Sequence, residues 1–265
     1  MRLLVLGPVE LWDCAGRQVY LPRRQQRLIL GLLGLEANHA VSIARLADLI
    51  WGERPPPVPL RVIQSRVSEL RSLLAAAAGG AGSAELVHAD GGYVLRTDLD
   101  AVDAHRFRRL VADARAHAAD DAAVALLRSA LDLWRGPVLG GPLAGFSYPA
   151  LCRGLESQRR GAAEDLFEIE LRLGRHHWVI GDLLDAVTVF PGDDRLNGQL
   201  MRALYGSGRA VEALQVYDAY RRWLGDELGI DPSAELQALH LKILRGDAGA
   251  SRPGVPAARQ PRSLS

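Results

Sequence analysis

One stretch of the chain carries side chains that can hydrogen-bond to nucleic acid, arranged opposite an apolar repeat. The apolar residues recur at intervals of three and four, the spacing of one buried face of an amphipathic helix: Leu60, Ile63, Val67, Leu70 and Leu74. The opposite side and its flanks carry guanidinium, amide and hydroxyl groups: Arg61, Gln64, Ser65, Arg66, Ser68 and Arg71. Arginine can pair with guanine and glutamine with adenine, and hydroxyls can bond a base or a phosphate. A solvated amphipathic helix has the same pattern, so the neighbouring elements must decide between the two interpretations.

A β-hairpin is predicted directly after this helix. Two short strand-like runs between Glu85 and Arg96 flank the turn pair Gly91-Gly92. A helix followed by such a hairpin is the pairing of a winged helix, in which the helix enters the major groove of DNA. This context favours DNA binding for the polar side of the segment Leu60–Leu74.

The elements before this helix complete the same domain. Three short extended runs separated by turn residues predict a small antiparallel sheet: Leu3–Leu6, Val9–Trp12 and Gln18–Leu21. A helical pattern follows Pro22 and ends near Asn38, and Ser42 is a good N-cap for a second helix over Ile43–Trp51. The order of an N-terminal sheet, three helices and a closing hairpin is that of a winged helix.

Further basic residues could hold the DNA backbone. Arg23 and Arg24 stand at the start of the first helix, and Arg96 closes the hairpin. Each could contact a phosphate, and each is equally well explained as a solvated arginine. Two acidic residues oppose DNA binding: Glu69 is expected in the middle of the outward helix face, and Asp90 stands at the hairpin tip. They support the alternative of a protein-interaction adaptor with a degenerate winged helix.

The rest of the chain is predicted to be helical. From Asp98 to about Gly246 the composition changes to Ala, Leu and Arg, with helical periodicity throughout. Small and large residues recur there as in a tetratricopeptide repeat, in which short side chains let two antiparallel helices approach closely. The three weak copies are Ala118, Ala123, Leu127 and Ala130; Gly174, Val179, Leu183, Ala186 and Pro191; and Gly208, Ala213, Tyr217 and Tyr220. The tryptophans expected in the core of this half are Trp134, Trp178 and Trp223.

Composition excludes most other classes of function. The 265 residues include 32 basic and 31 acidic ones, so the net charge of +1 says nothing about nucleic acid. Lys242 is the only lysine, which excludes a Walker phosphate-binding loop. Cys14 and Cys152 lie in no paired motif, and the adjacent His176 and His177 are a poor pair for one metal ion. With no nucleophile motif, signal peptide or membrane-length apolar run, we expect a cytoplasmic protein that is not an enzyme and has no cofactor or metal.

Eight short stretches together resemble the Streptomyces antibiotic regulatory protein (SARP) family. The stretches are Leu6–Glu10, Pro22–Arg27, Leu46–Glu53, Val67–Arg71, Gly92–Leu95, Leu131–Pro137, Leu204–Arg209 and Glu227–Ser233. In this family an OmpR-type winged helix is fused to a bacterial transcriptional activation domain of tetratricopeptide-like helices. The resemblance implies a mainly α protein with a winged-helix DNA-binding domain over residues 1–98 and the activation domain over residues 99–246. The polar composition of residues 247–265 adds a disordered tail.

The resemblance also implies a function. Family members are DNA-binding transcriptional activators, commonly of an antibiotic gene cluster, which bind tandem direct repeats near promoters and recruit RNA polymerase. Their protomers associate as dimers or in tandem on DNA. The resemblance assigns the reading of the repeat to the six polar residues of the Leu60–Leu74 segment. It assigns contact with the polymerase sigma subunit to the loop that begins at the end of the second helix, including Trp51, Glu53, Arg54 and Pro55. Glu69 and the prolines from Pro55 to Pro59 depart from the family pattern.

Overall fold

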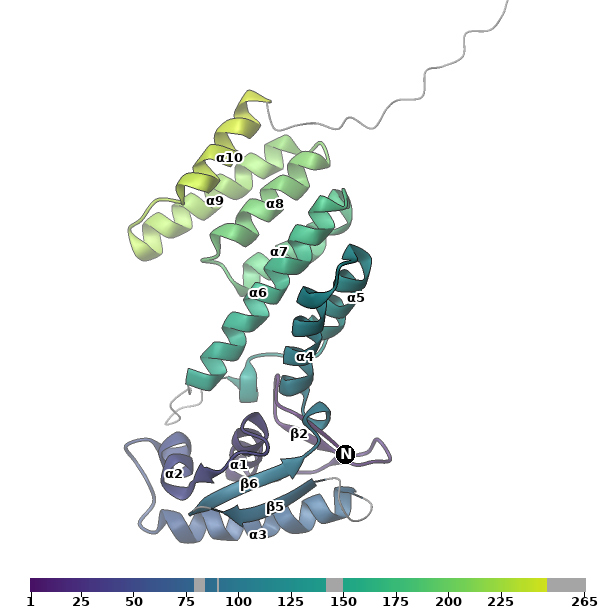
Figure 1. The fold of residues 1–265 in the computed structure, drawn as a ribbon. Coiled ribbons are helices and arrows are strands. Elements are labelled where there is room, and N and C mark those ends of the chain that lie inside the picture. The colour runs from purple at the N-terminus through teal and green to yellow at the C-terminus, as the bar shows by residue number, and fades with distance from the viewer. Residues whose placement is uncertain (79–83, 90, 142–149, 247–265) are drawn as a thin grey trace, which may run out of the picture. The chain divides into compact units, whose positions relative to one another are not determined.

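The computed structural model describes residues 1–78, 84–89, 91–141 and 150–246. Contacts between Cα atoms divide the chain into a first unit, residues 1–166, and a second unit, residues 167–265. The fold is mainly helical, with two small antiparallel sheets within residues 2–97 (Figure 1), which confirms the predicted fold class. In the described ranges, no helix combines the length and the hydropathy that a bilayer crossing requires. The predicted tail lies outside the described residues.

The first sheet consists of three short antiparallel strands. They are β1 (Arg2–Leu4), β2 (Glu10–Trp12) and β3 (Gln18–Val19). Leu3 pairs with Leu11, and both side chains are fully buried. Helix α1 (Arg24–Leu35) follows the sheet and buries its apolar run from Leu28 to Leu35. Sheet and helix lie where the sequence predicts them, because turn residues and apolar spacing are local signals.

Two further helices and a second sheet complete the winged helix. The elements are β4 (Val41–Ser42), α2 (Ile43–Trp51), α3 (Pro59–Ala78), β5 (Ala84–Ala89) and β6 (Gly92–Thr97). The Ser42 hydroxyl caps α2, as predicted, by accepting the backbone N–H of Arg45 at 3.1 Å. Strands β5 and β6 form the predicted hairpin, and β6 also pairs with β4.

Gly92 allows β4 and β6 to pair. A Cβ at this position would lie 2.1 Å from the carbonyl oxygen of Val41 and 2.8 Å from the Cα of Ser42. Both distances are far inside van der Waals contact, so any side chain here would push the two strands apart. The second glycine of the predicted turn is therefore required by the close approach of a third strand.

The apolar seam of α3 forms the core of the winged helix. Ile63, Val67, Leu70 and Leu74 are each at most 1% exposed, and α3 packs against α1, α2 and β5. Leu60, which we expected in the same seam, is instead 44% exposed, because it lies in the first turn of α3, before the buried residues begin. Each fully buried side chain of the seam contributes about 1.5–3 kcal/mol of transfer free energy. This burial determines which side of α3 faces solvent.

Buried polar contacts join the first sheet to the helices that follow it. These helices are the short η1 (Leu99–Ala101), α4 (Asp103–Ala116), α5 (Asp120–Leu131) and the short η2 (Val138–Gly140). The Asp103 carboxylate accepts the backbone N–H groups of Val5 at 2.8 Å and Leu6 at 3.1 Å, and the Leu6 carbonyl accepts the N–H of Arg135 at 2.7 Å. Burial raises the pKa of Asp103 to about 6, against the opposing effect of these hydrogen bonds and of Arg135. The contacts cross the boundary that we predict after residue 98, and the domain limits 1–98, 99–246 and 247–265 stay predictions.

The second unit continues the series of helices. The elements are α6 (Ala150–Arg172), which begins in the first unit, then η3 (His176–Trp178), α7 (Ile180–Val189), α8 (Asp194–Gly206), α9 (Ala210–Leu228) and α10 (Ala234–Arg245). From α7 to α10, successive helices pack against each other (Figure 1). Most large and small residues of the predicted repeats are buried, among them Val179, Leu183, Ala213, Tyr217 and Tyr220. The helical-repeat prediction is thereby confirmed.

The tryptophans of the helical half differ in burial. Trp134 is 8% exposed and meets Phe107 edge to face at 5.4 Å between ring centres, as expected for a core residue. Trp178 is 74% exposed, so the expectation that it packs in the core was wrong. It lies in the short η3 turn, which precedes α7 and does not extend its seam.

Candidate nucleic-acid interface

The outward side of α3 carries a row of exposed polar side chains. At about 100° per residue, Arg61, Ser65, Ser68 and Ser72 fall within an arc of about 60° on the helix, and all four are exposed. We call these four residues the α3 stripe. It lies opposite the buried seam and extends along about 16 Å of helix. Its one guanidinium and three hydroxyl groups can donate hydrogen bonds, and the hydroxyls can also accept them.

Gln64 and Arg71 flank the stripe on the side of the hairpin, and both are exposed. The Nε of Arg71 donates to the Leu86 carbonyl at 2.8 Å, and its guanidinium carbon lies 5.9 Å from the centre of the Tyr93 ring. Leu86 belongs to β5 and Tyr93 to β6, so this one side chain connects α3 with both hairpin strands. A guanidinium has five N–H donors, so Arg71 can still donate to a phosphate.

Arg66 and Glu69 flank the stripe on the side of α1. The Glu69 carboxylate accepts hydrogen bonds from Nη1 of Arg66 and Nε2 of Gln26, and it lies 3.8 Å from Nε of Arg23. Gln26 is 3% exposed, and its side-chain oxygen accepts the backbone N–H of Arg23 at 3.1 Å. We call Arg23, Gln26, Arg66 and Glu69 the α1–α3 cluster.

The α1–α3 cluster changes the role expected for Glu69. The hydrogen bond from Arg66, together with the charges of Arg66 and Arg23, holds the pKa of Glu69 below its ordinary value. Glu69 is therefore an ionised and paired carboxylate on the flank of α3. The expectation that it stands in the middle of the outward face was wrong, because its angular position is about 80° from Arg61.

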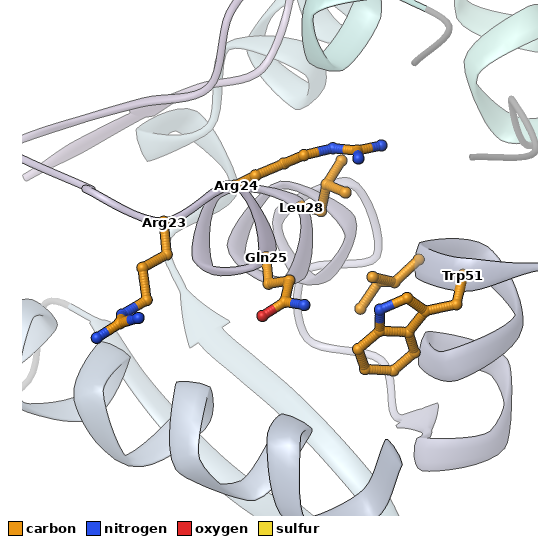
Figure 2. Close-up of a pocket in the computed structure, with 6 residues that line it drawn as sticks. Arg23, Arg24, Gln25, Leu28 and Trp51 are labelled. Carbon is orange, nitrogen blue, oxygen red and sulfur yellow. The ribbon is translucent and has the colours of Figure 1, made fainter. Parts of the chain in front are cut away.

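The other arginines predicted to bind DNA are more dispersed. Arg23 and Arg24 are both exposed at the start of α1, but their side chains extend in different directions, with Arg23 directed towards α3 (Figure 2). Arg96 is exposed on β6, opposite Glu85 in the strand register. Asp90 at the hairpin tip lies outside the described residues. The structure thus brings together the predicted residues of α3, whereas the side chains of Arg23 and Arg24 diverge from the start of α1 (Figure 2).

A small pocket lies between α1 and α2, with a volume of about 190 Å³. Its lining residues are Arg23, Arg24, Gln25, Leu28, Ile50 and Trp51. The Trp51 indole faces this pocket from the end of α2 (Figure 2). The loop that follows contains Glu53, Arg54 and Pro55, all of them exposed. The predicted polymerase-contact loop therefore begins at a pocket wall and continues along the surface.

A metal site would need several ligating side chains close together, and thiol chemistry would need an ionisable cysteine. Across the described ranges, no three His, Cys, Asp or Glu side chains gather where they could hold a metal ion. Cys152 is buried, and this burial raises the pKa of its thiol to about 12, so the thiol stays protonated near neutral pH.

Comparison with known proteins identifies the family. A profile of the bacterial transcriptional activator domain matches residues 102–244. The regulatory protein DnrI of Streptomyces peucetius is 36% identical over 267 residues, which cover 97% of this chain and 98% of DnrI. The chain belongs to the Streptomyces antibiotic regulatory protein family. The transcriptional regulator RedD of Streptomyces coelicolor is 35% identical to this SARP family member over 92% of this chain and 70% of RedD. The regulatory protein AfsR of Streptomyces griseus is 36% identical over 96% of this chain and 25% of AfsR.

A solved structure has the same fold. It is EmbR of Mycobacterium tuberculosis in complex with a low affinity phosphopeptide, with a TM-score of 0.79 and 32% sequence identity over 92% of this chain and 65% of the EmbR chain. The SARP family member thus spans nearly all of DnrI, about two thirds of EmbR and a quarter of AfsR. Its family and its named relatives make it a transcriptional regulator.

The sequence analysis did not identify two residues that shape the interface, Gln26 and Tyr93. Gln26 stands three positions after Arg23, the spacing of a capping box, and Glu69 stands three after Arg66, the spacing of a helical ion pair. The second signal could have indicated that Glu69 pairs with Arg66, whereas the bond from Gln26 to Glu69 joins two separate helices. Tyr93 had no such signal, because its contact with Arg71 joins two separate elements.

Proposed function

We propose that this SARP family member is a sequence-specific activator that binds tandem direct repeats near promoters and recruits RNA polymerase there. The regulated genes would form an antibiotic or other secondary-metabolite cluster, and the protein would act in the cytoplasm. The observation that carries the proposal is the α3 stripe. Its polar groups stand exposed opposite a fully buried seam, so α3 can enter a major groove without loss of its own packing.

Each predicted residue has a role suited to its position. Arg61 and Gln64 are the candidates for base recognition, because guanidinium and amide groups can form paired hydrogen bonds with guanine and adenine. Ser65 and Ser68 can bond a base edge or a phosphate. The residues proposed to contact phosphates at the margins of the groove are Arg71, Arg96 and Arg24, whereas Arg23 and Arg66 are directed towards Glu69.

The loop after α2 is the proposed contact with RNA polymerase, including its sigma subunit. Glu53, Arg54 and Pro55 are exposed in this loop, and Trp51 lines the adjoining pocket. Leu28 and Ile50 supply apolar walls to that pocket, which suits insertion of one partner side chain. On tandem repeats, two protomers would bind side by side or as a homodimer.

A gel-shift assay with promoter fragments from the surrounding gene cluster tests the proposal. Arg61→Ala should weaken binding to the preferred repeat by about 1–3 kcal/mol and relax the base preference at one position. Arg106→Ala is the matched control, because Arg106 is exposed on α4, outside the winged helix. Equal binding of promoter and scrambled duplexes, or no effect of Arg61→Ala, would show the proposal to be wrong.

The alternative of a protein-interaction adaptor rests on Glu69 and Asp90. The pairing of Glu69 removes the first of these supports, and Asp90 lies outside the described residues. The two functions differ in salt dependence. A DNA-binding surface releases counterions from phosphates, so its affinity falls steeply with salt, whereas an adaptor surface has none to release. A flat salt dependence would favour the adaptor.

A further inference from the structure

In the α1–α3 cluster, two arginines share one carboxylate beside the α3 stripe. Arg66 donates to Glu69, its side chain is only 16% exposed, and its Nε is buried with no hydrogen-bond partner in the described residues. Arg23 has a side chain that is 57% exposed and approaches the same carboxylate at 3.8 Å. Both guanidinium groups are therefore directed towards Glu69 and not along the α3 stripe.

Gln26 makes this cluster a link between two helices. Its amide nitrogen donates to Glu69 on α3, and its oxygen accepts the N–H of Arg23 at the start of α1. Gln26 is itself 3% exposed, and both hydrogen bonds are partly buried. The first turn of α1 is thereby tied to the flank of α3.

The inference rests on the proposed DNA binding. We propose that Glu69 is a specificity-determining residue, which keeps Arg66 and Arg23 from binding phosphates of any sequence and positions α3 against α1.

Two physical effects support this role. An arginine that neutralises a phosphate strengthens binding to every sequence, so it raises non-specific affinity without reading a base. A carboxylate that competes for the same guanidinium lowers this sequence-independent affinity. Base reading, in turn, requires side chains held on a rigid element, and the Gln26–Glu69 bond helps to fix α3. Loss of Glu69 should thus strengthen non-specific binding and weaken discrimination.

The variant Glu69→Gln tests the proposal, because glutamine keeps the side-chain size while it loses the charge that holds the arginines. Binding is measured by fluorescence anisotropy with a promoter duplex and a random-sequence duplex over a series of salt concentrations. For the random duplex, the slope of log K against log salt should steepen by about 0.9 for each released arginine. Each such contact should therefore increase the ratio of the affinity at ~0.1 M salt to the affinity at ~1 M salt by about eightfold. The promoter duplex should gain less, so that the ratio of the two affinities falls.

Two controls separate this effect from a simple change of net charge. Asp48 is exposed on α2 and forms no ion pair with any described residue. Asp48→Asn therefore removes one negative charge without releasing an arginine, and the salt slope should stay as in the wild type. Arg66→Met should also leave the slope unchanged, since Arg66 is already held by Glu69. Combined with Glu69→Gln, Arg66→Met should remove about 0.9 of the added slope.

The outcomes distinguish the two proposals. If wild-type protein binds neither duplex, the proposed function is wrong and the role of Glu69 is lost with it. If the wild type prefers the promoter but Glu69→Gln behaves like Asp48→Asn, only the role of Glu69 is wrong. A slope that falls by about 0.9 in Arg66→Met alone would also overturn it, because Arg66 would then already contact a phosphate.

Discussion

Asp103→Ala should destabilise the first unit by removing the acceptor for two buried backbone donors. Asp103 is 3% exposed, and its carboxylate accepts the N–H groups of Val5 and Leu6, both of which are fully buried. Alanine would leave both donors without a partner. An unsatisfied buried donor costs about 1–3 kcal/mol, so the two together should cost about 2–6 kcal/mol.

The size of this effect should depend on pH. Burial raises the pKa of Asp103 to about 6, above the ordinary value of 3.8, so the folded state binds the proton more tightly than the unfolded state does. The stability contributed by this proton is therefore present at low pH and is lost as the pH rises through about 6. Near neutral pH the wild type carries the cost of a buried charge, from which Asp103→Ala is free. The substitution should accordingly cost about 1 kcal/mol more at about pH 5 than at about pH 7.5.

Urea denaturation at these two pH values, followed by tryptophan fluorescence, measures both quantities. Trp134 is buried in the same unit and reports on its unfolding. Asp132→Ala is a suitable control, because Asp132 is an exposed aspartate at the end of α5 and should change stability by at most about 0.5 kcal/mol. The reasoning is refuted if Asp103→Ala is no more destabilising than this control, or if its cost is greater at the higher pH.

Three other substitutions probe the elements that position the interface. Leu70→Ala should cost about 2–5 kcal/mol of unfolding free energy, because Leu70 is fully buried. Leu60→Ala should cost much less, because Leu60 is 44% exposed. Equal costs in urea denaturation would contradict the assigned seam. Gly92→Ala should break the pairing of β4 with β6, because the Cβ of the alanine would meet the Val41 carbonyl. Hydrogen exchange at the Tyr93 amide should become faster. Unchanged protection of this amide would contradict the predicted clash. Arg71→Met should increase hydrogen exchange in β5 and reduce the salt slope of DNA binding by about 0.9. Arg61→Ala should leave hydrogen exchange in β5 unaltered. Unchanged exchange in β5 of Arg71→Met would show that the hydrogen bond from Arg71 to Leu86 is unimportant.

Local structure was largely predictable from the sequence. The Ser42 cap, the antiparallel strands around Leu3 and Leu11, and the buried seam from Ile63 to Leu74 all lie where spacing and turn residues place them. The small and large residues of the helical repeats were recognisable for the same reason. Caps, turns and amphipathic periods are produced by residues within a few positions of each other, so one sequence is sufficient to reveal them.

Pairing between distant residues was decided only by the tertiary structure. Glu69 was expected to repel DNA, yet the neighbouring Arg66 forms an ion pair with it, and Gln26 on another helix donates a hydrogen bond that holds it on the flank of α3. Asp103 gave no sign in the sequence that it would satisfy Val5 and Leu6, and Trp178 gave none that it would be exposed. The polar side chains of the proposed DNA-binding helix could thus be identified from the sequence. Which of its charges remain available depends on contacts between separate elements, because burial and pairing are properties of the folded chain and no local period encodes them.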